Sequence, residues 1–204
     1  MELKNDDAQG RFTSVADVKW QKCREQFARG GYVVIKRLIE QSTAEDLWRY
    51  VCHQANSGIL STTESMVPGT PWAYADVRME RLLQALRPSI EGVTGLALYE
   101  TYSYYRLYKH DDVLRRHTDR SSCEISVSLN LGQEPAVPWP LGIEGREGTN
   151  YVELVAGDAV VYRGLECPHW RDAYQGEHVA QVFLHYVDIE GPHRCFKYDR
   201  RKAL

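Results

Sequence analysis

Residues 117–131 have the sequence HTDRSSCEISVSLNL and decide the fold class of this chain. From Ile125 to Leu131 apolar residues alternate with polar ones, which is the period of a β-strand with one buried face. His117 and Asp119 stand two positions apart where this alternation begins, so on a strand their side chains would share one face. The stretch therefore predicts a strand that carries two side chains able to bind a metal ion.

A second histidine from a later strand would complete a set of two imidazoles and one carboxylate. Four histidines follow in the chain: His169, His178, His185 and His193. His169 is preferred because it comes after an apolar strand, at a strand edge, whereas a histidine inside the last strand is more often a packing residue. Two histidines and one carboxylate leave adjacent metal positions open and suit Fe(II) enzymes that activate O2.

A competing His-x-Asp pattern occurs at His110-Asp111-Asp112. It lies in the charged run Lys109–Val113 between two strand-like segments, which is typical of a solvated turn. We therefore expect the metal ligands to be His117, Asp119 and His169.

The rest of the chain predicts one α+β domain over residues 1–204, in which helices come first and short strands follow. Residues 1–12 are polar and are expected to be flexible. Residues 13–95 form a helical region packed on the β-core, which spans 96–190. Helices are expected at 14–30, 43–56 and 77–91, with Pro88 able to end the third early; strands are expected at 32–35, 96–108, 117–131, 151–155, 159–162 and 179–187, and loops at 57–72 and 132–148.

Composition excludes several classes of protein. The net charge of −3 and the lack of a basic stripe argue against a nucleic-acid partner. No apolar run approaches the length of a membrane span, and the first 30 residues lack the apolar core of a signal peptide. The five cysteines are scattered and form no CxxC pair, which favours reduced thiols and a cytoplasmic protein.

Several segments resemble the 2-oxoglutarate/Fe(II)-dependent dioxygenases, and within them the prolyl-4-hydroxylase-like group. The segment 157–162, GDAVVY, followed by His169, is similar to their Gly-Asp strand and distal histidine. Tyr108, nine residues before His117, matches a tyrosine of the group, and Leu129-Asn130 matches its Leu-Asn pair. The resemblance implies a double-stranded β-helix, or jelly-roll, with Fe(II) at its open end. It also implies that 2-oxoglutarate and O2 are consumed to hydroxylate a C–H bond of a small molecule, amino acid or peptide residue.

The chain departs from this family where the cosubstrate binds. Family members carry a basic residue on the last core strand, about ten residues after the distal histidine, and residues 177–181 offer no permanent cation. A dicarboxylate still needs a charged partner. Arg171 is the first choice for that partner, Arg106 the second and Arg163 the third, with Tyr108 beside them.

For the substrate we expect contacts from Arg120 and Trp170, which follow two of the ligands directly. The loops 133–148 and 57–76 are candidate lids. Two alternatives remain open from the residues alone: a cupin-type metal dioxygenase that does not use 2-oxoglutarate, and a non-catalytic binding module. The oligomeric state is not readable from the sequence.

Overall fold

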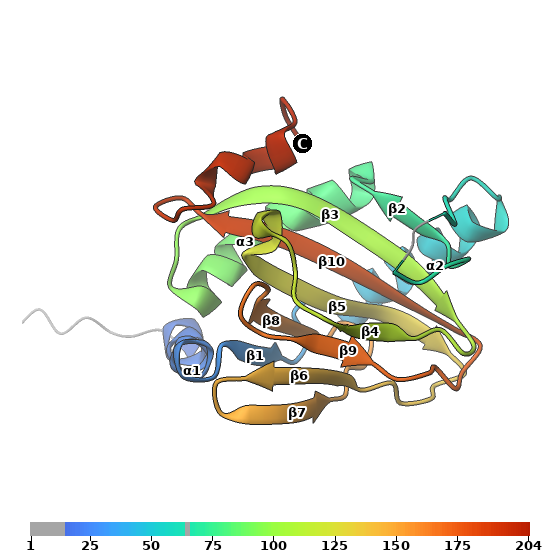
Figure 1. Cartoon of the computed structure of the whole chain (residues 1–204), viewed down its shortest axis with the longest axis horizontal. Coiled ribbons are helices and arrows are strands. Elements are labelled where there is room, and N and C mark those ends of the chain that lie inside the picture. Colours follow the sequence, from blue (N-terminus) through green and yellow to red (C-terminus); the bar gives the residue numbers. More distant parts are fainter. Residues whose placement is uncertain (1–14, 64–65) are drawn as a thin grey trace, which may run out of the picture.

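Two antiparallel sheets face each other in the computed structural model, which describes residues 15–63 and 66–204 (Figure 1). The larger sheet has the strand order β1-β8-β5-β10-β3-β2 and the smaller one β4-β9-β6-β7. The expected α+β class and jelly-roll core are confirmed. The expectation that residues 1–12 are flexible falls outside the described residues.

The strands of the larger sheet are, in spatial order, β1 (Tyr32–Ile35), β8 (Ala159–Arg163), β5 (Ile125–Glu134), β10 (His178–Asp188), β3 (Leu98–Lys109) and β2 (Trp72–Tyr74). Those of the smaller sheet are β4 (Leu114–His117), β9 (His169–Arg171), β6 (Leu141–Gly145) and β7 (Gly148–Val152). The helices are α1 (Val15–Gly30), α2 (Gln41–Asn56) and α3 (Val77–Thr94), with 3-10 turns η1 (Ser121–Cys123) and η2 (Arg194–Arg200).

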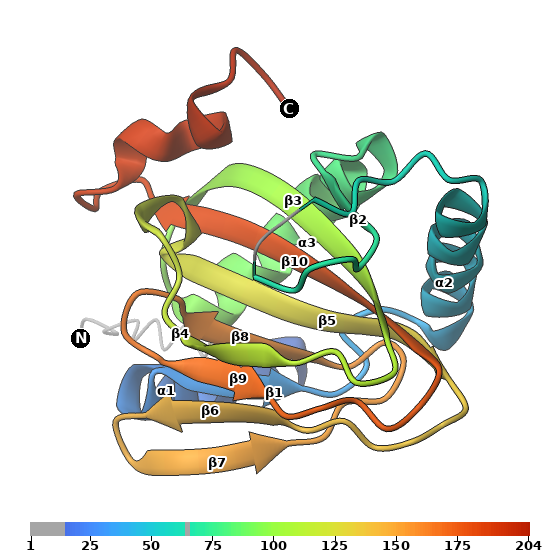
Figure 2. The same ribbon diagram turned by 45° about the vertical axis from the view of Figure 1, so that its right-hand side comes forward.

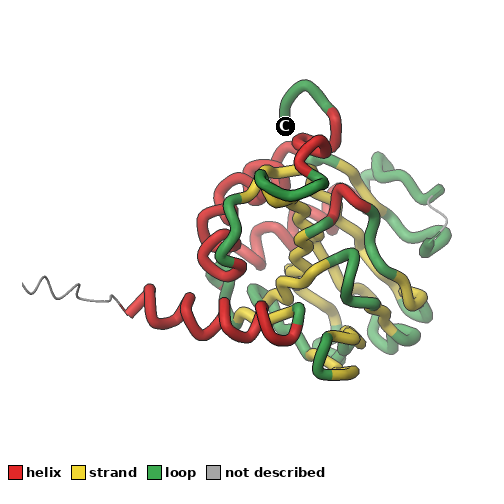
Figure 3. Tube along the Cα trace, turned by 60° about the vertical axis from the view of Figure 1, so that its left-hand side comes forward, coloured by secondary structure: helices red, strands yellow, loops and turns green. Residues whose placement is uncertain are grey.

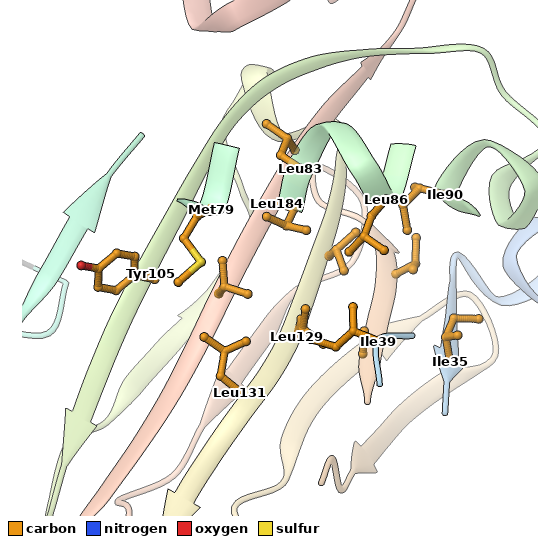
Figure 4. Packing of buried hydrophobic residues seen from close by; sticks show 14 of the residues in the cluster. Ile35, Ile39, Met79, Leu83, Leu86, Ile90, Tyr105, Leu129, Leu131 and Leu184 are labelled. Atoms are coloured by element: carbon orange, nitrogen blue, oxygen red, sulfur yellow. The ribbon is translucent and has the colours of Figure 1, made fainter. Parts of the chain in front are cut away.

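The helices gather on one side of the strands, as Figures 2 and 3 show, and cover the outer face of the larger sheet. Helix α3 contributes Leu83 and Ile90, which are fully buried in one cluster with Leu129 of β5 and Leu184 of β10; Figure 4 shows Leu83 beside Leu184. Burial of side chains of this size stabilises a fold by roughly 1.5–3 kcal/mol each. The main core therefore lies behind the larger sheet. The space between the two sheets holds smaller apolar clusters, which include Ile143 of β6 and Val160 of β8, together with buried polar side chains.

Helix α3 is longer than expected. Asp76 caps its first turn by accepting from the backbone N–H groups of Arg78 and Met79, and Gly95 ends it with a left-handed φ of 74°. The expectation that Pro88 ends this helix early is wrong. The apolar face continues past the proline and stays buried, so packing offsets the one backbone hydrogen bond that proline cannot donate. Helix α2 likewise begins two residues before the expected start.

The stretch 117–131 is not one strand. Strand β4 ends at His117 in the smaller sheet, the chain crosses through η1, and β5 begins at Ile125 in the larger sheet. The alternation expected from 117 therefore holds only from Ile125 onward. The backbone N–H of Asp119 donates to the carbonyl of Gly164 at 2.9 Å. This hydrogen bond fixes the position where the chain crosses from one sheet to the other.

The segment expected to be a loop at 132–148 contains the end of β5 and all of β6. The loop was expected from Pro135, Pro138 and Pro140, and these prolines do lie between the end of β5 and the start of β6. Trp139, expected on a lid, is buried and packs at 4.8 Å from Tyr108 and 5.0 Å from Tyr174, ring centre to ring centre. In the described part of the chain, no helix has the length and apolar character needed to cross a membrane.

Candidate metal centre

Three side chains converge at one edge of the smaller sheet. His117 ends β4 and His169 begins β9, and the two residues are register partners in the antiparallel pair. Oδ1 of Asp119 lies 3.7 Å from Nε2 of His117 and 3.6 Å from Nε2 of His169. The three candidate ligand atoms all lie within 4.8 Å of one another. The structure thus brings together the three residues that the sequence selected.

Both imidazoles are oriented by the backbone. Nδ1 of His117 donates to the carbonyl of Arg115 at 2.8 Å, and Nδ1 of His169 donates to the carbonyl of Cys167 at 3.0 Å. A carbonyl oxygen only accepts, so the proton of each neutral ring resides on Nδ1. The lone pair of each Nε2 then points toward the shared centre, which is the usual arrangement of histidines that bind a metal.

The carboxylate of Asp119 is held by residues that are not themselves candidate metal ligands. Its Oδ2 accepts a hydrogen bond from Ser126 Oγ at 2.7 Å, so Oδ1 is the oxygen that faces the histidines. Ser126 Oγ also lies 3.0 Å from Nδ1 of His185. Burial lowers the pKa of His185 to about 4, which keeps this ring neutral near pH 7. His185 is thus a support of the ligand set rather than a member of it.

Burial also lowers the pKa of His169, against the opposing pull of Asp119. A lowered pKa means that the ring is neutral and free to donate its lone pair at physiological pH. Tyr162 of β8 places its hydroxyl 3.3 Å from Nε2 of His169. Burial raises the pKa of Tyr162 well above its usual value, so the hydroxyl stays protonated beside the centre. No role for Tyr162 was predicted from the sequence. This residue lies on the strand expected at 159–162, two positions after Val160.

The three side chains open onto a cavity of about 380 Å³ between the two sheets. Aromatic rings form much of its wall, and Asp119 is the one carboxylate among the described residues that line it. The full lining consists of Met66, Tyr102, Tyr104, Arg106, Tyr108, Leu114, His117, Thr118, Asp119, Arg120, Cys123, Tyr162, His169, Phe183 and His185.

Two of the three arginines considered for the cosubstrate lie between the sheets. Arg106 lines the cavity and donates to the hydroxyl of Tyr104 at 2.8 Å. Arg171 is 2% exposed and is not among the residues that line the cavity. It donates to the carbonyl of Trp139, whose ring lies 4.7 Å from the guanidinium carbon. Burial lowers the pKa of Arg171 to about 10, so it remains a cation at pH 7. Arg163 instead contacts the ring of Phe27 at 4.9 Å, outside the cavity, which corrects the third choice.

Some of the buried polar atoms without a hydrogen-bond partner among the described residues belong to side chains of the two facing sheets. They include Nε and Nη2 of Arg171, Oγ of Ser128 and both amide atoms of Gln181. Gln181 is the register partner of Arg106, and Ser128 is the partner of the cavity residue Phe183. Buried polar groups are nearly always paired. This interior is therefore suited to a polar ligand with several acceptor oxygens, such as a dicarboxylate.

The two residues expected to contact substrate have different positions. Arg120 lines the cavity next to Asp119. Trp170 lies outside the cavity, packed over Gly142 and edge-on to Tyr151 with 5.9 Å between ring centres. Successive residues of a strand point to opposite faces, so Trp170 must face away from the cavity when His169 faces into it. The expectation for Trp170 is corrected on that ground.

Neither a family model nor a curated protein matches the sequence, whereas solved structures match the fold along most of the chain. A prolyl-4-hydroxylase of Pseudomonas putida is 20% identical, with a TM-score of 0.68 over 81% of this chain and 97% of that one. A prolyl hydroxylase of Trichoplax adhaerens, solved with a peptide fragment of hypoxia inducible factor, is 14% identical, with a TM-score of 0.72 over 90% and 94%. The α-ketoglutarate-dependent epimerase SnoN of nogalamycin biosynthesis is 13% identical, with a TM-score of 0.72 over 84% and 83%.

This chain has the fold of the 2-oxoglutarate-dependent oxygenases. The likeness covers more than four fifths of the chain and supports the resemblance drawn from the Gly-Asp strand, Tyr108 and the histidines. At these identities it establishes the fold, and the chemistry must be argued from the side chains.

Proposed function

We propose that this protein is an Fe(II)- and 2-oxoglutarate-dependent oxygenase that hydroxylates a C–H bond of a small molecule, an amino acid or a peptide residue. The observation that carries the proposal is the convergence of His117, Asp119 and His169 on one point. The Nδ1–H group of each histidine donates to a backbone carbonyl, which leaves both Nε2 atoms able to bind a metal ion. When bound, iron with 2-oxoglutarate and O2 would supply oxidation of the C–H bond with release of succinate and CO2.

The residues of the chain have separate tasks in this function. His117, Asp119 and His169 would hold the metal on one side and leave its other positions open to the cavity. Ser126 keeps the carboxylate of Asp119 turned toward the metal position through its 2.7 Å hydrogen bond. Tyr162 keeps a proton beside the centre and can donate it to an oxygen of a bound ligand. The aromatic wall excludes water from the reacting atoms.

Arg171 is proposed as the partner of the far carboxylate of 2-oxoglutarate. It lies two residues after His169 on β9, so both side chains point between the sheets from the same strand face. Its Nε and Nη2 atoms have no hydrogen-bond partner among the described residues and offer two parallel donors to a carboxylate. A cation at this position on β9 would replace the basic residue that related enzymes carry on the last core strand.

Anaerobic titration with Fe(II) and 2-oxoglutarate tests the function. We expect a weak visible charge-transfer band in the wild-type protein and no band in His169→Ala. His110→Ala is the matched control, because His110 belongs to the other His-x-Asp pattern and its side chain is 60% exposed on a turn. A band that persists in His169→Ala would contradict the proposed ligand set. Binding of Fe(II) without any band on addition of 2-oxoglutarate would favour the cupin-type alternative.

The same titration tests the cosubstrate anchor. Arg171→Met should raise the Kd for 2-oxoglutarate about 100-fold or more, because it leaves a buried carboxylate without its cation. Arg106→Met should raise that Kd less, since Arg106 already donates to the hydroxyl of Tyr104 and does not share a strand with either histidine. The opposite ranking would assign the anchor to Arg106.

A further inference from the structure

The guanidinium group of Arg120 is already engaged by a carboxylate of the same chain. Nη1 of Arg120 donates to Oδ1 of Asp199 at 3.0 Å, and Nη2 donates to Oδ2 at 2.8 Å. This two-pronged contact is the geometry with which arginine recognises a carboxylate group. Arg120 also lines the cavity and directly follows the ligand Asp119. A carboxylate-binding site therefore exists at the cavity wall, and a side chain of η2 occupies it.

Asp199 belongs to a segment that follows β10 and lies over one end of β3 (Figure 2). Its side chain is 11% exposed, and Oδ2 also accepts a hydrogen bond from the hydroxyl of Tyr74 at 2.6 Å. Tyr198, Asp199 and Arg200 have φ values of 54°, 52° and 63°. Three successive non-glycine residues in the left-handed region are strained. The contacts of Asp199 to Arg120 and Tyr74 help to hold this strained backbone, and Arg201 anchors its far end by donating to Glu80 and to the carbonyl of Thr101. Loss of the contact to Arg120 therefore favours release of the backbone around Asp199.

The surroundings of Arg120 define the rest of the ligand. The guanidinium lies 4.7 Å above the ring of Tyr102, and that ring is flanked by Tyr74 at 4.9 Å and His185 at 4.6 Å. These flat surfaces suit an apolar or aromatic body. Asp119 is the one acidic side chain among the described residues that line the cavity. The negative charge that an incoming carboxylate must replace at Arg120 is therefore that of Asp199.

We propose that Arg120 binds the carboxylate of the substrate, and that Asp199 holds the same donors until the substrate displaces it. The substrate is then a small carboxylic acid with an apolar or aromatic body. The inference rests on the proposed oxygenase function for the reaction, although the exchange of carboxylates on Arg120 is a binding event in its own right. The apparent affinity for the acid is reduced by the fraction of protein in which Asp199 occupies the site.

Matched acids and amides test this exchange on the full chain loaded with Fe(II) and 2-oxoglutarate without O2. The probes are 3-phenylpropanoate with 3-phenylpropanamide, and N-acetylleucine with N-acetylleucinamide. Binding is followed by the change in the visible band, and release of residues 194–201 by hydrogen exchange. We expect the acids to bind about tenfold tighter than their amides and to increase exchange in this segment.

Two variants move the result in opposite directions. Asp199→Asn should tighten acid binding about three- to tenfold and raise exchange in the segment without any ligand. Arg120→Gln should abolish the preference for acids over amides. Arg116→Gln is the matched control, because Arg116 pairs with Glu144 and is absent from the cavity lining. It should behave as the wild type.

Equal binding of acids and amides by the wild type, no binding of any probe, or unchanged acid binding in Asp199→Asn would each overturn the inference. The band formed with 2-oxoglutarate alone separates this failure from that of the proposed function. A protein that forms the band but shows no preference for acids overturns only the role of Arg120. A protein without the band overturns the proposed function, and hydrogen exchange of residues 194–201 on addition of the acids and amides then decides the role of Arg120.

Discussion

Replacing Ser126 with alanine removes the hydroxyl that holds the carboxylate of Asp119. Ser126 Oγ donates its one proton to Oδ2 at 2.7 Å, so it can only accept from Nδ1–H of neutral His185 at 3.0 Å. The substitution frees Asp119 to rotate and removes the acceptor of His185. We expect metal binding to weaken although all three ligands remain.

The size of the effect follows from the burial of the carboxylate. A hydrogen bond to a charged group contributes about 1.5–3 kcal/mol. The side chain of Asp119 is 12% exposed, so water can replace part of the lost contact and the lower half of this range applies. About 1.5–2 kcal/mol corresponds to a Kd that is roughly 10–30-fold weaker. Loss of outer partners of metal ligands typically costs about 10–100-fold in affinity.

Calorimetric titration of the metal-free protein with Ni(II), without 2-oxoglutarate, measures this change. Ser128→Ala is the matched control, since it removes the same atom two residues along β5. Ser128 is equally buried, and its hydroxyl has no hydrogen-bond partner among the described residues. Its metal affinity should equal that of the wild type.

Unchanged Ni(II) affinity in Ser126→Ala would refute the role of the hydroxyl, because Asp119 would then be held by other contacts. Equal losses in both serine variants would also refute it, since they would point to a general loosening of β5. Thermal unfolding of the metal-free variants identifies that second case.

Three further predictions concern the frame of the site. Gly164→Ala should lower metal affinity more than tenfold and reduce Tm. The added Cβ would lie 2.1 Å from the carbonyl oxygen of Cys123 and 2.6 Å from Oδ2 of Asp119, so one of these groups must move. Metal titration measures the affinity, and thermal unfolding measures Tm. The folded pKa of His185, about 4, lies below the unfolded value near 6.5, so the unfolded chain binds its proton first as pH falls. The free energy of unfolding of the metal-free protein should therefore decrease from pH 6.5 to pH 4, by up to about 3 kcal/mol from this residue, and His185→Gln should flatten the profile in urea titrations. Leu83→Ala on the fully buried face of α3 should cost about 2–5 kcal/mol in the same urea titration and leave Ni(II) affinity unchanged.

Local sequence was sufficient for much of the fold. The period of 3.6 residues in α3 and the alternation from Ile125 onward reflect side chains that must be buried on one face, and each such face is encoded within a few residues. The convergent group proposed as the ligand set was also accessible, because His117 and Asp119 are close in the chain and His169 follows a recognisable Gly-Asp strand. Local chemistry alone distinguished the charged turn at His110, which is not part of the convergent group among the described residues, although Asp112 of this turn is buried rather than solvated.

Tertiary structure alone decided how these elements are placed. The break between β4 and β5 depends on Asp119 meeting the carbonyl of Gly164, which lies 45 residues away in the sequence. Trp170 faces outward because His169 faces inward, and the position of Arg171 between the sheets follows from the same alternation once β9 is known. The pairing of Arg120 with Asp199 joins two segments that share no local pattern. Contacts between distant residues are set by the packing of the whole chain, which a periodicity of a few residues does not contain.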